Sequence, residues 1–273
     1  MNTNPLRQYF RRPAVYMRLP SNGIGYPPGS ITLPENGELP VFPMTAIDEI
    51  TSKTPDALYN GAAIIEIIKS CVPDIKDPWV IPGNDIDAIL IAIKAASGDS
   101  LSIPSTCPKC ENSEDYGLNL QALLASLKAG DYSSEFEIND LKVKFRPLNY
   151  KEMNDAALAQ FEINKANVLI NTDIPDAEKS KILENALKEI TSQTMIILSK
   201  SIEYIKTPQT IVDNKDYILD FIKNCDKNVY IAMRDYSAKL RTDSELKPLE
   251  IKCTNCSNEY QQPYTLNISD FFG

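Results

Sequence analysis

Two widely separated C-x-x-C motifs are the feature that most constrains how this chain of 273 residues can fold. One motif contains Cys107 and Cys110, and the other contains Cys253 and Cys256. Two residues between paired cysteines allow both sulfurs to point at one centre, and two such pairs supply the four thiolates of a closed tetrahedral zinc site. We therefore predict that the four cysteines bind one structural zinc ion, which has no open position for a catalytic water.

A redox-active dithiol is the alternative for each motif, and it normally opens a helix directly after a buried strand. The residues around Cys107 and Cys110 are instead typical of a strand, a tight turn and a second strand, so we favour the metal site. Many zinc-binding motifs have a glycine after the second cysteine, where the backbone needs a positive φ. Here the following residues are Glu111-Asn112 and Ser257-Asn258, and asparagine is the non-glycine residue that best tolerates this conformation.

The composition excludes several kinds of active site. The chain contains no histidine, which rules out histidine metal sites, histidine bases and Ser-His or Cys-His nucleophiles. Carboxylate chemistry is the remaining enzyme alternative, with Asp85 and Asp87 or Asp48 and Glu49 as candidate pairs. Acidic residues near a helix start more often stabilise the helix dipole, and no glycine-rich phosphate loop is present. We expect no enzymatic activity and no small-molecule substrate.

The formal net charge of −9 argues against nucleic-acid binding by the whole chain. The main alternative function is a zinc-ribbon protein that binds nucleic acid or has a regulatory role, because Lys109 and Lys252 adjoin the C-x-x-C motifs. Glu111, Glu114 and Asp115 make the local balance acidic. No run of about eighteen apolar residues and no N-terminal signal sequence is present, so we expect no transmembrane segment and a protein made in the reducing cytoplasm.

The positions of prolines, cysteines and apolar repeats predict an α+β fold that is mostly helical and has a small zinc-ribbon-like β module. We expect an extended proline-rich N-terminal arm at residues 1–44, a helical segment at 45–100, a discontinuous zinc-ribbon module at 101–120 and 248–273, and an insert at 121–247. The two C-x-x-C motifs belong to one module, so the insert must leave it and return.

The insert is predicted to contain a β-hairpin at residues 134–147, because polar and apolar residues alternate on both sides of Asn139-Asp140. Two long helices are expected at about 151–169 and 176–204. The second helix has one apolar face, which suits either an intramolecular helix pair or the groove of a partner. We favour the intramolecular pair because the preceding helix can cover this face.

Both ends of the chain have features suited to docking. Residues 1–20 contain four arginines and no acidic residue, which is typical of either a solvated arm or a tether that binds an acidic neighbour. The given sequence closes with Phe271-Phe272-Gly273, and burial of each aromatic ring stabilises a fold or an interface by roughly 2 kcal/mol or more. We expect these two rings to pack under the zinc module or into another subunit.

Seven short segments along the chain together carry a resemblance to a known family. They are Arg12-Pro13-Ala14-Val15-Tyr16-Met17-Arg18-Leu19-Pro20, Tyr26-Pro27-Pro28-Gly29, Pro43-Met44-Thr45-Ala46-Ile47-Asp48-Glu49, Cys71-Val72-Pro73-Asp74-Ile75-Lys76, Cys107-Pro108-Lys109-Cys110, Phe145-Arg146-Pro147-Leu148 and Phe271-Phe272-Gly273. In these residues the chain resembles the baseplate hub proteins of T-even-type contractile-tailed bacteriophages. The resemblance implies a structural or assembly role in the virion tail baseplate, with assembly in the host cytoplasm. It also implies that the partners are the hub, central spike and tape-measure proteins.

Overall fold

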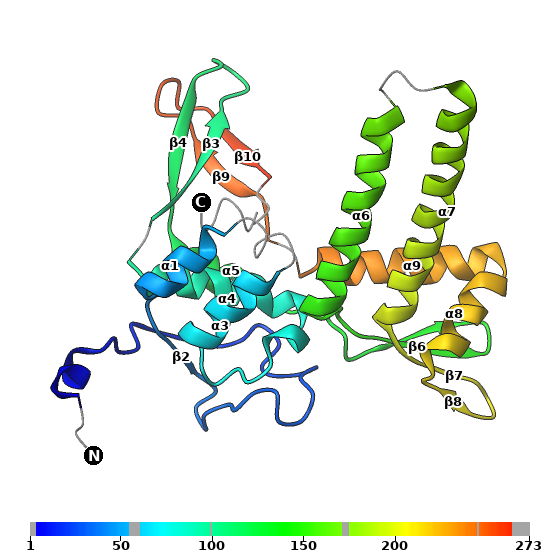
Figure 1. Cartoon of the computed structure of the whole chain (residues 1–273), viewed down its shortest axis with the longest axis horizontal. Helices are drawn as coiled ribbons and strands as arrows, with labels where there is room; N and C mark the ends of the chain where they lie inside the picture. Colours follow the sequence, from blue (N-terminus) through cyan, green and yellow to red (C-terminus); the bar gives the residue numbers. More distant parts are fainter. Residues whose placement is uncertain (1–3, 55–60, 99, 171–174, 245, 264–273) are drawn as a thin grey trace. The chain divides into compact units, whose positions relative to one another are not determined.

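The computed structural model describes residues 4–54, 61–98, 100–170, 175–244 and 246–263 (Figure 1). The chain divides into two compact units, of which the first contains residues 1–129 and 244–273 and the second contains residues 130–243. Helices and small antiparallel sheets build both units, so the predicted α+β fold is confirmed. The finer division into an arm, a helical segment, a ribbon and an insert stays a prediction, and Phe271 and Phe272 lie outside the described residues.

Short helices form the core of the first unit. Its elements before the first hairpin are the 3-10 turn η1 (Pro5–Tyr9), strands β1 (Val15–Met17) and β2 (Leu39–Val41), helix α1 (Ala46–Ser52), helix α3 (Ala62–Cys71), the 3-10 turn η2 (Pro78–Val80) and helix α4 (Gly83–Ala96). Strands β1 and β2 pair antiparallel. Ile64 and Ile68 of α3 and Ile89 and Ile93 of α4 are completely buried, as the apolar repeats of both helices require.

The N-terminal segment is bound to this core through Arg11. Its guanidinium group donates hydrogen bonds to the carbonyl oxygen of Pro43 and to the carbonyl and hydroxyl oxygens of Ser70, the latter two at 2.7 Å. It also pairs with the buried carboxylate of Asp48 at 3.3 Å. Asp48 forms a capping box with Thr45 at the start of α1. The carboxylate of Asp48 thus caps the N-terminus of α1 and also binds the N-terminal segment through Arg11.

Two antiparallel hairpins contain the C-x-x-C motifs. The first consists of β3 (Leu101–Thr106) and β4 (Ser113–Leu118), and the second consists of β9 (Leu249–Lys252) and β10 (Glu259–Gln262). Helix α5 (Leu120–Ser126) follows β4 and contacts α4. In each hairpin the motif forms the turn between the two strands, as expected from its flanking residues.

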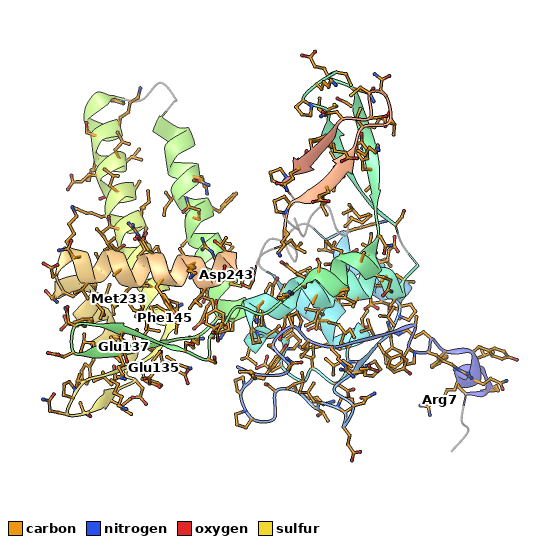
Figure 2. All side chains as sticks on the ribbon, turned by 180° about the vertical axis from the view of Figure 1, so that it is seen from behind. Arg7, Glu135, Glu137, Phe145, Met233 and Asp243 are labelled. Carbon is orange, nitrogen blue, oxygen red and sulfur yellow. The ribbon has the colours of Figure 1, made fainter. Side chains whose placement is uncertain are left out.

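The second unit is built on a four-stranded antiparallel sheet in the order β5-β6-β7-β8. Its strands and helices are β5 (Glu135–Ile138), β6 (Leu141–Phe145), α6 (Tyr150–Ile170), α7 (Asp176–Ser201), β7 (Ile202–Lys206), β8 (Ile211–Val212), α8 (Lys215–Asn224) and α9 (Lys227–Thr242). Strands β5 and β6 pair within residues 134–147, and Asn139 takes a positive φ of 53° in the turn. Phe145 and Met233 belong to the buried core of this unit (Figure 2).

The prediction that the second long helix continues to residue 204 is wrong, because α7 ends at Ser201. Ile202 and Ile205 are buried, and their strand β7 pairs with β6. The tertiary pairing and the β-branched side chains outweigh the helical repeat at this point.

Helices α6 and α7 run side by side and contact each other, but Leu187 of α7 is still 62% exposed. None of the helices in the described ranges is long and apolar enough to cross a bilayer.

Candidate metal centre

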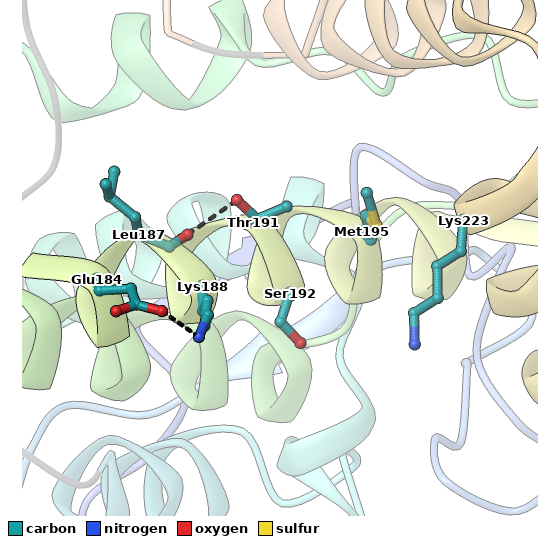
Figure 3. Close-up of a pocket in the computed structure, with 7 residues that line it drawn as sticks. All are labelled: Glu184, Leu187, Lys188, Thr191, Ser192, Met195 and Lys223. Atoms are coloured by element: carbon teal, nitrogen blue, oxygen red, sulfur yellow. Dashed lines mark hydrogen bonds and ion pairs between the residues drawn. The ribbon is translucent and has the colours of Figure 1, made fainter. Parts of the chain in front are cut away.

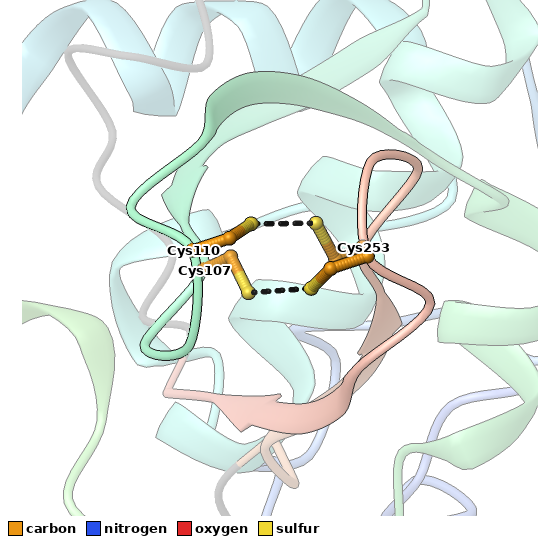
Figure 4. A group of neighbouring side chains, drawn as sticks. Cys107, Cys110 and Cys253 are labelled. Carbon is orange, nitrogen blue, oxygen red and sulfur yellow. Dashed lines mark hydrogen bonds between the residues drawn. The ribbon is translucent and has the colours of Figure 1, made fainter.

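The turns of the two hairpins bring all four cysteines of the C-x-x-C motifs together (Figure 4). Their Sγ atoms lie within 4.8 Å of one another, and the pairs Cys107–Cys256 and Cys110–Cys253 are each 3.6 Å apart. All four are free cysteines, since a disulfide needs sulfurs about 2.05 Å apart. Zinc–sulfur bonds of about 2.3 Å in a tetrahedron place the sulfurs roughly 3.8 Å apart. The donor set and its spacing therefore fit a zinc ion.

Both turns are closed by the same two backbone hydrogen bonds, each 2.9 Å long. The N–H of the first cysteine donates to the carbonyl five residues later, and the N–H four residues after the first cysteine donates back to its carbonyl. These bonds are Cys107 N–H to Asn112 O, Glu111 N–H to Cys107 O, Cys253 N–H to Asn258 O and Ser257 N–H to Cys253 O. The repeated geometry gives the two motifs matching, rigid turns.

The residue directly after the second cysteine of each motif takes the left-handed conformation. Glu111 and Ser257 both have a φ of 56°. The expectation that asparagine supplies this conformation is wrong, because the asparagines lie one position further on. The side-chain amide of Asn258 instead points an N–H group at Cys107 Sγ, at 4.0 Å. The left-handed conformation costs a non-glycine residue about 1–2 kcal/mol, so the turns hold strain that the rest of the centre must offset.

The sulfurs affect one another's ionisation. Burial raises the pKa of Cys107, but the backbone N–H groups of Lys109 and Cys110 and the neighbouring thiols outweigh it and lower the value to about 6. Although a backbone N–H at Asn258 favours its thiolate, burial and the neighbouring thiols raise the pKa of Cys256 to about 12. The pKa of Cys107 therefore lies well below that of Cys256. A bound metal ion would be needed to keep all four as thiolates at neutral pH.

Polar side chains also connect the two hairpins. The hydroxyl of Ser105 on β3 lies 2.8 Å from the hydroxyl of Tyr260 and donates a hydrogen bond of 2.8 Å to Gln262. At the turns, the Thr254 hydroxyl contacts both carboxylate oxygens of Glu114, at 2.6 and 2.5 Å. That bond lowers the pKa of Glu114. These cross-hairpin contacts could not be predicted from the sequence, because no spacing motif links Ser105 with Tyr260 or Thr254 with Glu114, whereas paired C-x-x-C motifs indicate a shared metal site.

The carboxylates proposed for the enzyme alternative have structural contacts. Asp48 belongs to the α1 capping box and the Arg11 ion pair. Asp85 is completely buried and accepts hydrogen bonds from the N–H and hydroxyl of Ser21. Both carboxylates therefore have roles in holding the first unit together.

An open hollow of about 540 Å³ lies along α7 and takes in Lys223 of α8 (Figure 3). It is lined by Glu184, Leu187, Lys188, Thr191, Ser192, Met195 and Lys223. Its one carboxylate, Glu184, pairs with Lys188 at 2.6 Å. No second carboxylate is among these lining residues, so the hollow does not contain a carboxylate pair of the kind that the enzyme alternative requires.

Two hairpins joined through four converging cysteines define an α+β protein with a candidate structural metal centre. A family model described as T4 bacteriophage base plate protein matches residues 30–273, and the chain belongs to this family. The resemblance in the sequence is thus confirmed at the level of a T4-type baseplate protein. Neither a curated protein nor a solved structure matches the chain. Family membership makes the chain a structural component of the phage tail baseplate, where other tail proteins are its partners.

Proposed function

We propose that this chain is a non-enzymatic structural or assembly protein of the baseplate hub, and that Cys107, Cys110, Cys253 and Cys256 bind one structural zinc ion. The observation that carries the proposal is the convergence of four Sγ atoms within 4.8 Å, from two distant hairpins of a baseplate-family chain. The ion would cross-link the hairpins as a zinc ribbon. Four thiolates close its coordination sphere, so the centre would organise the fold and not activate water.

The residues around the sulfurs supply the rest of the centre. The two matching turns fix the direction of each cysteine. The backbone N–H groups of Lys109 and Cys110 and the side-chain amide of Asn258 favour negative charge on Cys107 Sγ. The Ser105–Tyr260 contact and the Thr254–Glu114 contact hold the hairpins together independently of the sulfurs. The resulting rigid module would present docking surfaces to the hub, central spike or tape-measure protein, after assembly in the reducing host cytoplasm.

The nucleic-acid alternative gains no support from the charges near the turns. Lys252 pairs with Glu259 at 3.3 Å, so that cation is offset by a neighbouring acid. Glu114 adds a carboxylate beside Thr254. A basic surface with exposed aromatic side chains would be expected on a nucleic-acid-binding ribbon.

The direct experiment is complementation of a phage that lacks this gene. Plasmids would supply the wild-type chain, the Cys253→Ser variant or the matched Cys225→Ser variant, and quantitative mass spectrometry would measure the chain in purified hub intermediates and tails. We expect the wild type and Cys225→Ser to enter hub intermediates and to restore infectious tails, and Cys253→Ser to fail. Hub intermediates that assemble normally without any copy of the chain would overturn the proposal.

A further inference from the structure

Strand β4 has one edge without a partner strand in the described part of the chain. β3 and β4 form a two-stranded sheet, so β4 is paired along one side only (Figure 1). Its six residues pair with β3 in one continuous register. β4 contains no bulge, proline or lysine, the features that often protect an edge. A regular strand with a bare edge is a template for a further strand.

The register of the hairpin shows which backbone groups of β4 point away from β3. Directly opposed residues of an antiparallel pair alternate between hydrogen-bonded and non-bonded pairs. Cys107 donates its N–H to the carbonyl of Asn112 at 2.9 Å, so this pair is hydrogen-bonded. The alternation then leaves Ser113, Asp115 and Gly117 in non-bonded pairs. Their N–H and C=O groups point outward, at the spacing that an added strand requires.

The opposite edge of the hairpin is protected by a proline. Pro104 of β3 lies directly opposite Asp115, so its ring nitrogen points away from β4. Proline has no N–H, and the outer edge of β3 therefore lacks a donor in the middle of the strand. The hairpin is thus suited to a further strand beside β4 and not beside β3.

The space beside the edge of β4 is open. Ser113, Asp115 and Gly117 are all exposed, and a Cβ atom added at Gly117 would meet no described atom within 4 Å. The opposite face of the hairpin is occupied, because Ser105 on that face is buried and contacts Tyr260 of the second hairpin. An added strand would therefore extend the first hairpin without displacing the second.

The side chains of β4 define which strand fits this edge. Glu114 already accepts hydrogen bonds from Thr254 and Asn112. The exposed carboxylate of Asp115 has no hydrogen-bond or ion-pair partner among the described residues. A residue added beside Asp115 has its side chain on the same outer face, and the next residues along that strand lie beside the half-buried Tyr116 on the inner face. A basic residue between apolar residues suits these positions.

The same carboxylate disfavours a second copy of β4 as the added strand. Two fully overlapping β4 strands, paired antiparallel about a two-fold axis, would bring Asp115 of one copy opposite Asp115 of the other. Like charges directly opposite each other destabilise a strand pair. The edge therefore favours a basic segment of a different chain.

We propose that the outer edge of β4 binds an extended segment of another tail protein by strand addition. A lysine or arginine of that segment lies beside Asp115, and the residues on either side of it are apolar. Backbone hydrogen bonds to Ser113, Asp115 and Gly117 supply affinity, and the side chains supply selectivity. The inference rests on the proposed function, since it identifies the surface with which the chain docks on another tail protein and the chemistry of the docked segment.

The first test is fluorescence-polarisation binding of a short labelled peptide of alternating valine and lysine to the full chain. We expect the peptide to bind, and a peptide with glutamate in place of lysine to bind about tenfold more weakly. A third peptide has N-methyl groups on the lysine backbone nitrogens, which removes the donors that face the edge. It should also bind about tenfold more weakly, because each lost hydrogen bond leaves an edge acceptor without a partner.

Two substitutions at one position test the edge itself. Gly117→Pro removes an outward N–H and adds a ring at the edge, but it removes no hydrogen bond to β3. We expect it to weaken peptide binding about tenfold. The matched control is Gly117→Ala, which keeps the N–H and should bind like the wild type, because the added Cβ meets no described atom within 4 Å. Zinc content and hydrogen exchange of both hairpins would verify that each variant is folded.

A charge reversal keeps the proposal testable even if Gly117→Pro unfolds the hairpin. Asp115→Lys leaves the backbone unchanged and should reverse the preference, so that the glutamate peptide binds more tightly than the lysine peptide. Binding that neither Asp115→Lys nor N-methylation changes would overturn the proposal. No binding of the lysine peptide up to its solubility limit would also overturn it. A wild-type dimer that Gly117→Pro dissociates would assign the edge to a second copy and contradict the proposal.

The phage complementation assay separates this inference from the proposed function. Folded Gly117→Pro chain should bind zinc but fail to enter hub intermediates, whereas Gly117→Ala should enter them. Infectious tails restored by Gly117→Pro would overturn the role of the β4 edge and leave the proposed function standing. The proposed function itself fails only if hub intermediates assemble normally without the chain.

Discussion

The Sγ atoms of Cys110 and Cys253 lie 3.6 Å apart, although the two residues are 143 positions apart in the chain. The whole second unit, residues 130–243, is inserted between them. Bringing residues so far apart in the chain together on folding costs considerable loop-closure entropy. The free energy of metal binding to the four sulfurs would offset that cost. The hairpins are also short, and strands β4 and β10 contain no buried residue, so we expect a metal ion at the four sulfurs to contribute much of the stability of this module.

Replacing one sulfur should open the hairpins without unfolding the second unit. In Cys253→Ser, hydrogen exchange should accelerate in residues 101–118 and 249–262, because a metal centre with three thiolates binds much more weakly. Exchange in 130–243 should stay close to that of the wild type, since that unit has its own core. Cys225→Ser is the control, because Cys225 packs beside the core of the second unit and is not one of the four clustered cysteines. Unchanged exchange in both hairpins of Cys253→Ser would contradict this account.

Glycine should relieve the strain in the two turns. Glu111 and Ser257 both adopt a φ of 56°, which glycine accepts without steric cost. We expect Ser257→Gly to raise the stability of the metal-bound protein by up to about 1 kcal/mol, and Ser257→Val to lower it, since a β-branched residue is strained in this conformation. Thermal unfolding of the three proteins measures both effects. Equal destabilisation by glycine and valine would show that the turn holds no such strain.

The cysteine cluster and the turn at Asn139 could be predicted from the sequence. In a C-x-x-C motif and in a turn between two alternating strands, a few neighbouring residues determine the local geometry. Other features depend on partners far along the chain. Strand β7 forms because Ile202 and Ile205 pair with β6, which a helical repeat cannot reveal. The role of Arg11 depends likewise on Asp48, 37 positions away. The four arginines near the N-terminus look alike in sequence, but Arg11 alone among them binds that buried carboxylate.

Arg11 should stabilise the first unit more than its neighbour does. Arg11→Ala leaves the buried carboxylate of Asp48 without its cation and leaves the carbonyls of Pro43 and Ser70 without a donor, so we expect a loss of about 2 kcal/mol. Arg12→Ala removes an exposed side chain and should change stability by less than about 0.5 kcal/mol. Urea unfolding at protein concentrations too low for association measures both variants. Equal losses would refute the special role of Arg11.

The buried carboxylate of Asp85 should make stability depend on pH. Burial raises its pKa, against the lowering effect of the hydrogen bonds from Ser21. The unfolded-state pKa is about 3.9, so the folded state binds the proton more tightly. The resulting stabilisation is complete below that pH and is lost as pH rises through the folded-state pKa.

The matched variant for this effect is Asp85→Asn, which cannot titrate. The unfolding free energy of the wild type minus that of the variant should fall as pH rises from about 4. Titration of the cysteines and of all other acids is common to both proteins and cancels in the difference. A difference that is constant or that grows with pH would contradict the burial of a titrating carboxyl group at this position.

The most direct test of the central claim is the metal content of the folded protein. The chain would be purified under reducing conditions without added metal, and elemental analysis would be combined with native mass spectrometry. We predict one zinc ion per chain in the wild type and in Cys225→Ser, with zinc lost from Cys253→Ser. Folded wild-type protein with well under one zinc ion per chain, or with zinc retained in full by Cys253→Ser, would contradict the account.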